Sequence, residues 1–367
     1  MRFHSGWVSA DAGKCTSRQN APMPHGNPDG RFGTLLAFDL ARLDIRDVLR
    51  ISAVACIVTA IPLAAGNPAA AIPLSIGAVF SGVSEAGLPF GYRWRTMLWT
   101  TLWLMVGVFL GSAVSNTIWL AIALSLPVAF VAGAVGYRGP RAAVAGLLAL
   151  VVFTIYAGTP VPLDDAFTSA ALMGLGGFSQ FIVSVIACVL LGRHRIPHVR
   201  EDGVPLNTLF TGERTFLTHA IRLAIVITIA TAISELMSMP HQYWLPMTVA
   251  WMSKPDRHGT VNRVIHRIAG TLIGVVIIGG IDFFISPGMW GFYALSMIGA
   301  AIAVAFIWVN YATAVIGVTM WVIGLFALLS DPVAETLVLR IVLTVAAGVM
   351  VLIAAAVHLP GSRATVR

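Results

Sequence analysis

The sequence predicts an all-α, polytopic membrane protein with about twelve transmembrane helices, arranged as two parallel six-helix repeats. Three observations support this prediction: the composition, the spacing of the apolar segments and the distribution of basic residues. Of the 367 residues, 57% are hydrophobic and 11% are charged, and the mean hydropathy is +0.86. Soluble domains carry about 25% charged residues and could not shield this much apolar surface from water. A soluble enzyme is therefore excluded.

Twelve apolar segments approach the length of about 20 residues that a bilayer-spanning helix needs. The first six cover about 48–66, 69–84, 97–114, 118–136, 140–158 and 166–191. The second six cover about 219–238, 242–253, 264–285, 289–309, 311–329 and 335–358. We therefore predict six-helix repeats over residues 48–191 and 218–359, joined by a cytoplasmic linker over 192–217 and followed by a cytoplasmic tail over 360–367.

The N-terminal 47 residues are predicted to lie on the cytoplasmic side. Residues 1–30 are polar, lack the apolar core of a signal peptide and are expected to be disordered. From Arg31 to Asp47, leucines and phenylalanines recur at helical spacing among charged residues. This pattern predicts an amphipathic helix that lies on the inner membrane surface.

Basic residues alternate between the predicted loops and so indicate an orientation. Arginines and lysines occupy the N-terminal tail, the linker, the C-terminal tail and the loops after the second, fourth and eighth segments. The connections near 66–68, 115–117, 159–165, 238–241, 286–288 and 330–334 contain neither lysine nor arginine. The positive-inside rule then places both termini in the cytoplasm of a multi-pass protein of the cell membrane.

The two halves resemble each other at an offset of about 172 residues. The matched pairs include Arg50 with Arg222, Pro73 with Pro246 and Arg95 with Arg267. Six spans in each half give both halves one orientation, as in transporters with parallel repeats. The second and eighth segments are short and interrupted by these prolines, and 242–253 extends for only about 18 Å at 1.5 Å per residue. Short, broken segments at matching positions favour a central binding site or pathway, or else a tilted helix.

The sequence lacks the motifs of several catalytic sites. We find no phosphate-binding loop, no HExxH zinc motif and no nucleophile elbow, and the three cysteines are too scattered for a metal site. We therefore expect no enzyme activity, no cofactor and no bound metal. The net charge of +7 is explained by membrane orientation, so we expect no nucleic-acid partner.

One stretch of the second half carries a family resemblance. Tyr243-Trp244-Leu245-Pro246-Met247-Thr248 leads into Lys254-Pro255, Gly259-Thr260, Arg263, Arg267 and Gly270-Thr271. This order resembles the fusaric acid resistance (FUSC) and aromatic acid exporter families over about 219–290. The corresponding part of the first half lacks the Gly-Thr pairs, and the large soluble segments of many relatives are missing. The resemblance implies an inner-membrane permease that exports aromatic carboxylates or similar anions.

The candidate pathway residues come from this stretch and from the last span. Arg263 and Arg267 lie four residues apart, so with Lys254 and Arg257 they are predicted to form a positive cytoplasmic mouth, or simply to anchor the helix. Trp244, Thr248 and Trp251 are candidates for substrate contacts, the tryptophans alternatively as interface anchors. Two charged residues complete the set. Arg340 is predicted to bind the anion, or else to form a structural ion pair. Glu235 is predicted to couple transport to protons, or else to be a carboxylate in water at a helix end.

The expected function is gradient-driven export of small organic, aromatic anions across the cytoplasmic membrane. The alternatives are a passive anion channel, which would need no titrating carboxylate, and a membrane scaffold without transport activity. The expected partners are the lipid bilayer and the anionic substrate, with a homo-oligomer or an accessory efflux subunit as further candidates.

Overall fold

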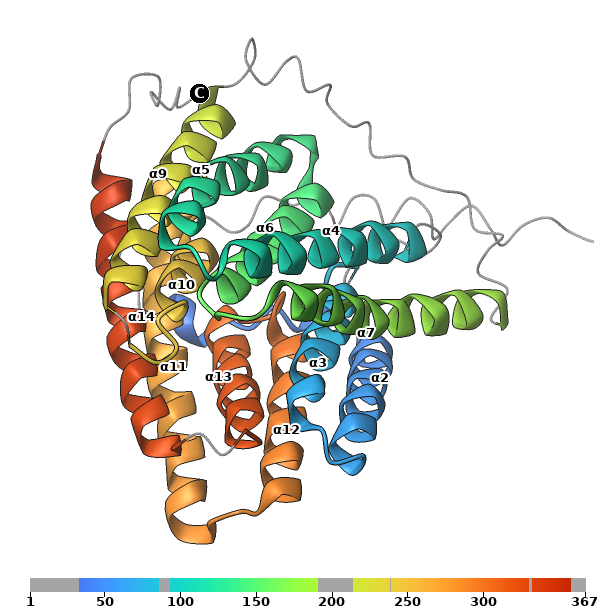
Figure 1. The fold of residues 1–367 in the computed structure, drawn as a ribbon. Helices are drawn as coiled ribbons and strands as arrows, with labels where there is room; N and C mark the ends of the chain where they lie inside the picture. Colours follow the sequence, from blue (N-terminus) through green and yellow to red (C-terminus); the bar gives the residue numbers. More distant parts are fainter. Residues whose placement is uncertain (1–32, 86–92, 191–213, 238, 330–331, 358–367) are drawn as a thin grey trace, which may run out of the picture. The chain divides into compact units, whose positions relative to one another are not determined.

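The computed structural model describes residues 33–85, 93–190, 214–237, 239–329 and 332–357. Residues 1–37 and 38–367 form separate units. The described part of the larger unit contains twelve α-helices and no strand (Figure 1). These helices are α2 (Ile45–Ala64), α3 (Pro68–Val83), α4 (Arg93–Val114), α5 (Ile118–Val135), α6 (Pro140–Ala157), α7 (Leu163–Leu190), α9 (Arg214–Met237), α10 (Trp244–Met252), α11 (Arg257–Ile285), α12 (Met289–Phe306), α13 (Tyr311–Ala327) and α14 (Val333–Ala356).

Each predicted apolar segment corresponds to one of these helices, which confirms the all-α polytopic fold. Among the described residues, nine helices are long and apolar enough to cross a membrane. The other three are α3, α13 and α10, with 16, 17 and 9 residues. The number of crossings and the cytoplasmic position of both termini stay predictions.

The prediction of a single amphipathic helix from Arg31 to Asp47 is wrong. Within the described residues, this stretch contains two short 3-10 helices, Gly33–Leu36 and Leu40–Arg42. The α-helix α2 then begins at Ile45, because the Asp44 carboxylate accepts hydrogen bonds from the backbone N–H groups of the first turn. Residues 1–30 and most of the predicted linker lie outside the described residues.

Helix packing in the first six helices recurs in the second six. α3 and α4 both pack against α7, and α10 and α11 both pack against α14. Likewise α4 packs on α6, and α11 packs on α13 (Figure 1). The contacts between the halves also correspond, since α5 packs on α9 and α12 packs on α2. Two copies of one six-helix unit require this correspondence, while the repeat boundaries stay a prediction.

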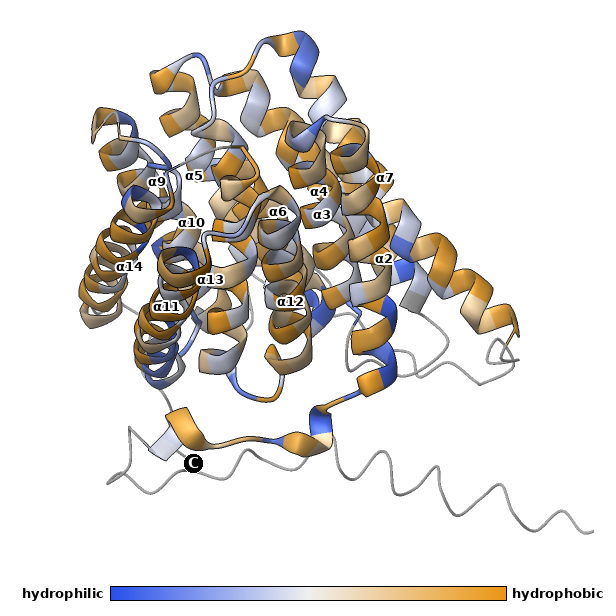
Figure 2. Cartoon of the chain, turned by 90° about the horizontal axis from the view of Figure 1, so that it is seen from below, coloured by the Kyte–Doolittle hydropathy of each residue, from blue (hydrophilic) through white to orange (hydrophobic). Residues whose placement is uncertain are grey.

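Apolar side chains cover much of the outside of the helices, as expected where lipid replaces water. Phe283, Phe284 and Val276 of α11 are exposed, and so are Val349 and Ile353 of α14. Figure 2 shows apolar residues along these two helices and along α2. Among the described residues, the buried side chains include many threonines and serines as well as two arginines. This distribution is that of a multi-pass membrane protein.

Candidate functional site

α10 is the shortest α-helix in the described part of the chain, as its prolines and its limited apolar length predicted. It begins after His241, whose backbone has a φ of 54°, and Pro246 lies in its first turn, where a missing N–H is tolerated. After its last turn, the Arg222 guanidinium donates to the carbonyl oxygens of Lys254 and Pro255, at 2.7 and 3.3 Å. Nine residues span about 13 Å, less than half of a hydrocarbon core of about 30 Å.

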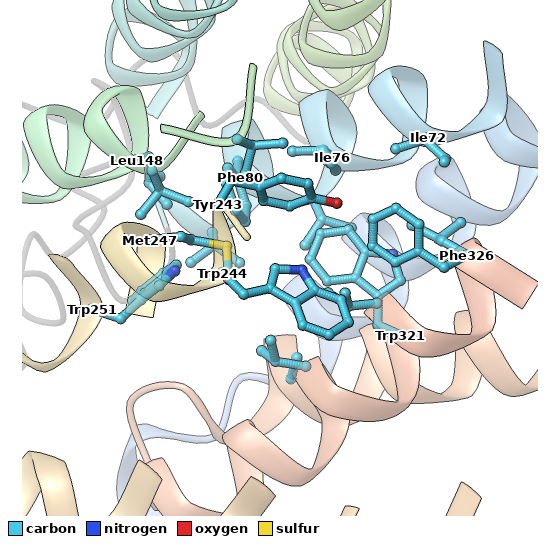
Figure 3. A pocket seen from close by; sticks show the side chains of 18 of the residues that line it. Ile72, Ile76, Phe80, Leu148, Tyr243, Trp244, Met247, Trp251, Trp321 and Phe326 are labelled. Carbon is cyan, nitrogen blue, oxygen red and sulfur yellow. The ribbon is translucent and has the colours of Figure 1, made fainter. Parts of the chain in front are cut away.

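An aromatic cavity lies beside α10, between helices from both halves. Its lining comes from α3 and α6 of the first half and from α10, α12 and α13 of the second half. The centre of a water-sized sphere can reach about 80 Å³ of it, within about 820 Å³ of empty space that includes open solvent. Figure 3 shows the aromatic rings gathered around it, those of Phe80, Tyr243, Trp244, Trp251, Trp321 and Phe326. The short helices α3 and α10, each with a proline inside, both line this cavity.

Contacts between the rings and one hydrogen bond fix the walls of the cavity. The Trp321 indole donates to Ser75 Oγ of α3 at 3.0 Å, which joins the two halves. The ring centroid of Phe80 lies 5.9 Å from that of Trp321 and 6.2 Å from that of Trp251, both edge-to-face. Because edge-to-face contacts are favourable for aromatic pairs, the cavity presents a pre-formed aromatic surface.

Two buried arginines lie behind this cavity in the second half. Arg340 of α14 is 0% exposed, and Arg267 of α11 is 1% exposed. No described residue accepts a hydrogen bond from Nε, Nη1 or Nη2 of Arg340, or from Nε or Nη2 of Arg267. The remaining Arg267 nitrogen, Nη1, lies 3.5 Å from the Tyr311 hydroxyl. Neither arginine forms an ion pair with a carboxylate in the described part of the chain.

The two guanidinium groups belong to one site. They come from α11 and α14, which pack against each other, and Arg267 Nη1 lies 3.5 Å from the Tyr311 hydroxyl. The central carbon of Arg340 lies 4.9 Å from the centroid of the Trp244 ring, which also lines the cavity. Trp244 therefore contacts both the aromatic cavity and the buried Arg340.

Three threonines follow this site along the helices. Arg340 of α14 contacts Trp244 of α10. Eight residues later on both helices, Gly348 lies close to Met252, because a Cβ added to Gly348 would be 4.0 Å from Met252 Cε. α14 and α10 therefore run parallel, which places Thr344 level with Thr248, one turn after Arg340 and Trp244. Thr271 lies one turn after Arg267 on α11. All three hydroxyls are buried and accept or donate no hydrogen bond within the described residues.

Of the residues predicted to form a cytoplasmic cationic mouth, Arg257 is exposed and Lys254 and Arg263 are half-buried, and the mouth itself stays a prediction. Arg267 does not belong to it, because its side chain is buried in the interior. Arg263 stacks on the Tyr311 ring at 3.7 Å and donates to the Trp251 carbonyl oxygen at 3.3 Å. Lys254 lies in the loop before α11, where the positive charge of Arg263 and partial burial lower its pKa to about 8 against the opposing effect of Asp256.

The remaining candidate residues are distributed as follows. Trp251 lines the cavity and Thr248 lies behind it, so both are near the site. Glu235 is buried near the end of α9, but it is not among the described residues that line the cavity. Its part in proton coupling stays a prediction.

Sequence reasoning missed Tyr311 and the aromatic lining contributed by the first half and by α13. A buried ion pair of the first half was also missed, in which Arg50 contacts Glu85 and Asp47. Glu85, two residues after the end of α3, could have signalled that pair, because Arg50 repeats at Arg222 and Glu85 corresponds to Arg257 at the same offset of 172 residues. The equivalent positions thus carry opposite charges in the two halves.

The region that contains both buried arginines matches a known protein family. Residues 229–354 match the model of the family described as fusaric acid resistance protein-like. The family resemblance is confirmed for this part of the chain. The match includes α10, α11, α13 and α14, so the FUSC-like region supplies both buried arginines and Trp244.

Curated relatives match a similar length of the chain. Inner membrane protein YccS of Escherichia coli is 32% identical over 136 residues, which are 37% of this chain and 19% of the relative. An uncharacterized protein of Haemophilus influenzae is 28% identical over 132 residues, 36% of this chain and 18% of that protein. The chain thus covers less than a fifth of the length of these relatives. No solved structure matches the chain.

Proposed function

We propose that this FUSC-like protein exports small organic anions, aromatic carboxylates above all, from the cytoplasm across the inner membrane. The pair of buried arginines without an acidic partner is the observation that carries the proposal. A charge inside a membrane protein costs several kcal/mol unless a partner or a cavity compensates it. An anion bound between Arg267 and Arg340 would supply the compensation that no described carboxylate supplies.

The aromatic cavity supports an aromatic substrate. A ring in the cavity would contact Phe80, Trp321 and the edge of Trp244, while its carboxylate would point past that edge towards the guanidinium group of Arg340, which lies against the same indole. Guanidinium and carboxylate form paired hydrogen bonds, which give direction as well as affinity. The family description agrees with this chemistry, because fusaric acid is itself an aromatic carboxylic acid.

The cytoplasmic approach is provided by Lys254 and Arg263, which concentrate anions near the start of α11. Uphill export would need an ion gradient, since we propose no catalytic step. Glu235 is the candidate for proton coupling, because a buried carboxyl group can exchange a proton during transport. A passive channel would use the same arginines without this carboxylate.

Transport by purified protein tests the proposal. Proteoliposomes are given labelled 4-hydroxybenzoate and a pH gradient, with wild-type protein, Arg340→Gln and Arg46→Gln. Arg46 is exposed, so its substitution makes the same chemical change outside the site. We expect gradient-driven accumulation with the wild type and with Arg46→Gln, and its loss with Arg340→Gln. Downhill flux alone would support the channel, and no flux in any sample would contradict transport of this substrate class.

A further inference from the structure

The charge balance of the arginine site restricts the ligand further than its aromatic lining does. Arg267 and Arg340 each carry one positive charge, and the groups that surround them are hydroxyls and aromatic rings. Carboxylates do occur on the surrounding elements, but at other positions. Among the described residues, they are Glu235 near the end of α9, Asp256 before α11, Asp282 near the end of α11 and the exposed Glu335 in the first turn of α14.

None of these carboxylates forms an ion pair with either arginine. Asp282 lies fifteen residues after Arg267 on the same helix, which is about 22 Å along the axis. The two positive charges therefore have no carboxylate partner among the described residues of the FUSC-like region. A ligand with one negative charge would neutralise one guanidinium and leave the other buried and charged, repelled by its neighbour.

The hydrogen-bond donors of the two arginines also indicate a ligand with two acidic groups. All five N–H groups of a guanidinium are donors, and at Arg340 none has an acceptor within the described residues. At Arg267, Nε and Nη2 lack an acceptor, which adds three more. One carboxylate forms a paired contact with one guanidinium fork, so two forks require two carboxylates or an equivalent dianion.

We propose that the site binds two negative charges at once and that its ligand class is an aromatic dianion, such as a benzene dicarboxylate. This inference rests on the proposed function, since it names the charge class of the anion that is bound. In this arrangement, each guanidinium grips one acidic group, and the hydroxyls of Tyr311, Thr248, Thr271 and Thr344 serve as further donors. The ring contacts Trp244, which lines the cavity and also lies against Arg340.

Two ligands of the same shape and different charge test this inference. Isophthalate carries two carboxylates, and monomethyl isophthalate keeps the ring and both carbonyl groups but has one charge. Binding to the purified full chain in detergent is measured by calorimetry at pH 7.5, in a low-salt buffer with and without added chloride. We expect wild-type protein to bind isophthalate at least tenfold more tightly than the monoester.

Substitution of one arginine should reverse this preference. Arg340→Gln leaves one positive charge, so we expect the monoester to bind this variant at least as tightly as isophthalate does. Arg267→Gln should behave in the same way, and Arg46→Gln should keep the wild-type preference. Thermal unfolding of each variant verifies that it is folded.

The outcomes separate this inference from the proposed function. Equal affinity of the wild type for the two ligands would overturn the dianion class and leave anion binding intact. Monoester binding that becomes as tight as isophthalate binding when chloride is added would also overturn it, since chloride would then supply the second charge. Failure of folded wild-type protein to bind either ligand would contradict the proposed function itself.

Discussion

The guanidinium of Arg340 lies against the indole ring of Trp244, with its central carbon 4.9 Å from the ring centroid. A cation–π contact of this kind contributes about 2 kcal/mol when it is desolvated. Removal of an ion from water costs several kcal/mol, so the contact compensates only part of the cost of burying Arg340. The rest is available to a ligand, which is why this pair of residues is central to the proposed anion site.

Removal of the Arg340 charge should therefore stabilise the empty protein. Arg340→Met keeps a long side chain and eliminates the unpaired charge, so we expect the free energy of unfolding without ligand to rise by about 1–4 kcal/mol. Thermal unfolding in detergent measures this change. Lower stability of the variant would show that Arg340 has a structural partner.

Arg50 offers a matched control with the opposite expectation. Its guanidinium pairs with Glu85, which is 0% exposed, so Arg50→Met would leave a buried carboxylate without its partner. We expect a loss of about 3–5 kcal/mol in the free energy of unfolding. Replacement of both residues, by Met and Gln, should recover much of this loss. If Arg50→Met and Arg340→Met had the same effect, the distinction between paired and unpaired arginines would be wrong.

The number and positions of the helices followed from the sequence, because apolar length is decisive in a bilayer. The short α10 followed as well, since Pro246 and the limited apolar stretch both restrict it. The stretch from Arg31 to Asp47 was misassigned as one helix. Helical periodicity there competes with Asp44, whose side chain caps the start of α2 and so separates this helix from the preceding turns.

The site was predictable in its residues but not in its geometry. Arg340 could be selected because a charge inside an apolar segment is unusual, and Arg267 because it lies four residues after Arg263 in the FUSC-like stretch. Whether their side chains come together depends on how α11, α10 and α14 are aligned along their axes. The spacing of residues within one helix does not determine that alignment. The aromatic cavity also needs α3 and α6 of the first half, so no local pattern could have indicated it.

Lys254 should make anion capture depend on pH. Its pKa is lowered to about 8, so its positive charge disappears as the pH rises through that value. We expect anion affinity to fall between about pH 7 and pH 9, and Lys254→Arg should flatten this profile because arginine stays charged.

The lowered pKa of Lys254 also means that this group increases the free energy of unfolding as the pH rises from about 8 towards 10.5. An unchanged affinity profile in Lys254→Arg would exclude Lys254 from anion capture.

Residue accessibility tests the membrane orientation. Asp164 at the start of α7 is predicted to lie outside, and His258 in the first turn of α11 is predicted to lie inside; both are exposed. In a variant whose native cysteines are replaced, Asp164→Cys should react with an impermeant thiol reagent added to intact cells. His258→Cys should react only after the cells are opened. The opposite labelling would contradict the twelve-crossing topology.

Close packing of α11 against α13 should not tolerate an added methyl group. A Cβ on Gly270 would lie 2.7 Å from Val315 Cβ and would also overlap the Ala312 carbonyl oxygen. We expect Gly270→Ala to lower the free energy of unfolding by about 1–3 kcal/mol, because neighbouring backbone must move. Gly348→Ala provides the comparison, since its Cβ would lie 3.2 Å from a flexible Val264 methyl group. Equal stability of the two variants would contradict this close contact.

The central claim is that Arg267 and Arg340 hold an anion whose ring occupies the aromatic cavity. Crystals of the full chain soaked with 4-iodobenzoate test it most directly, because anomalous diffraction locates the iodine. We expect one strong iodine peak between Phe80, Trp244 and Trp321, with carboxylate density beside the guanidinium groups, and no such peak when both arginines are replaced by Gln. A peak only at the Lys254 loop, or an unchanged cavity peak in the double variant, would contradict the account.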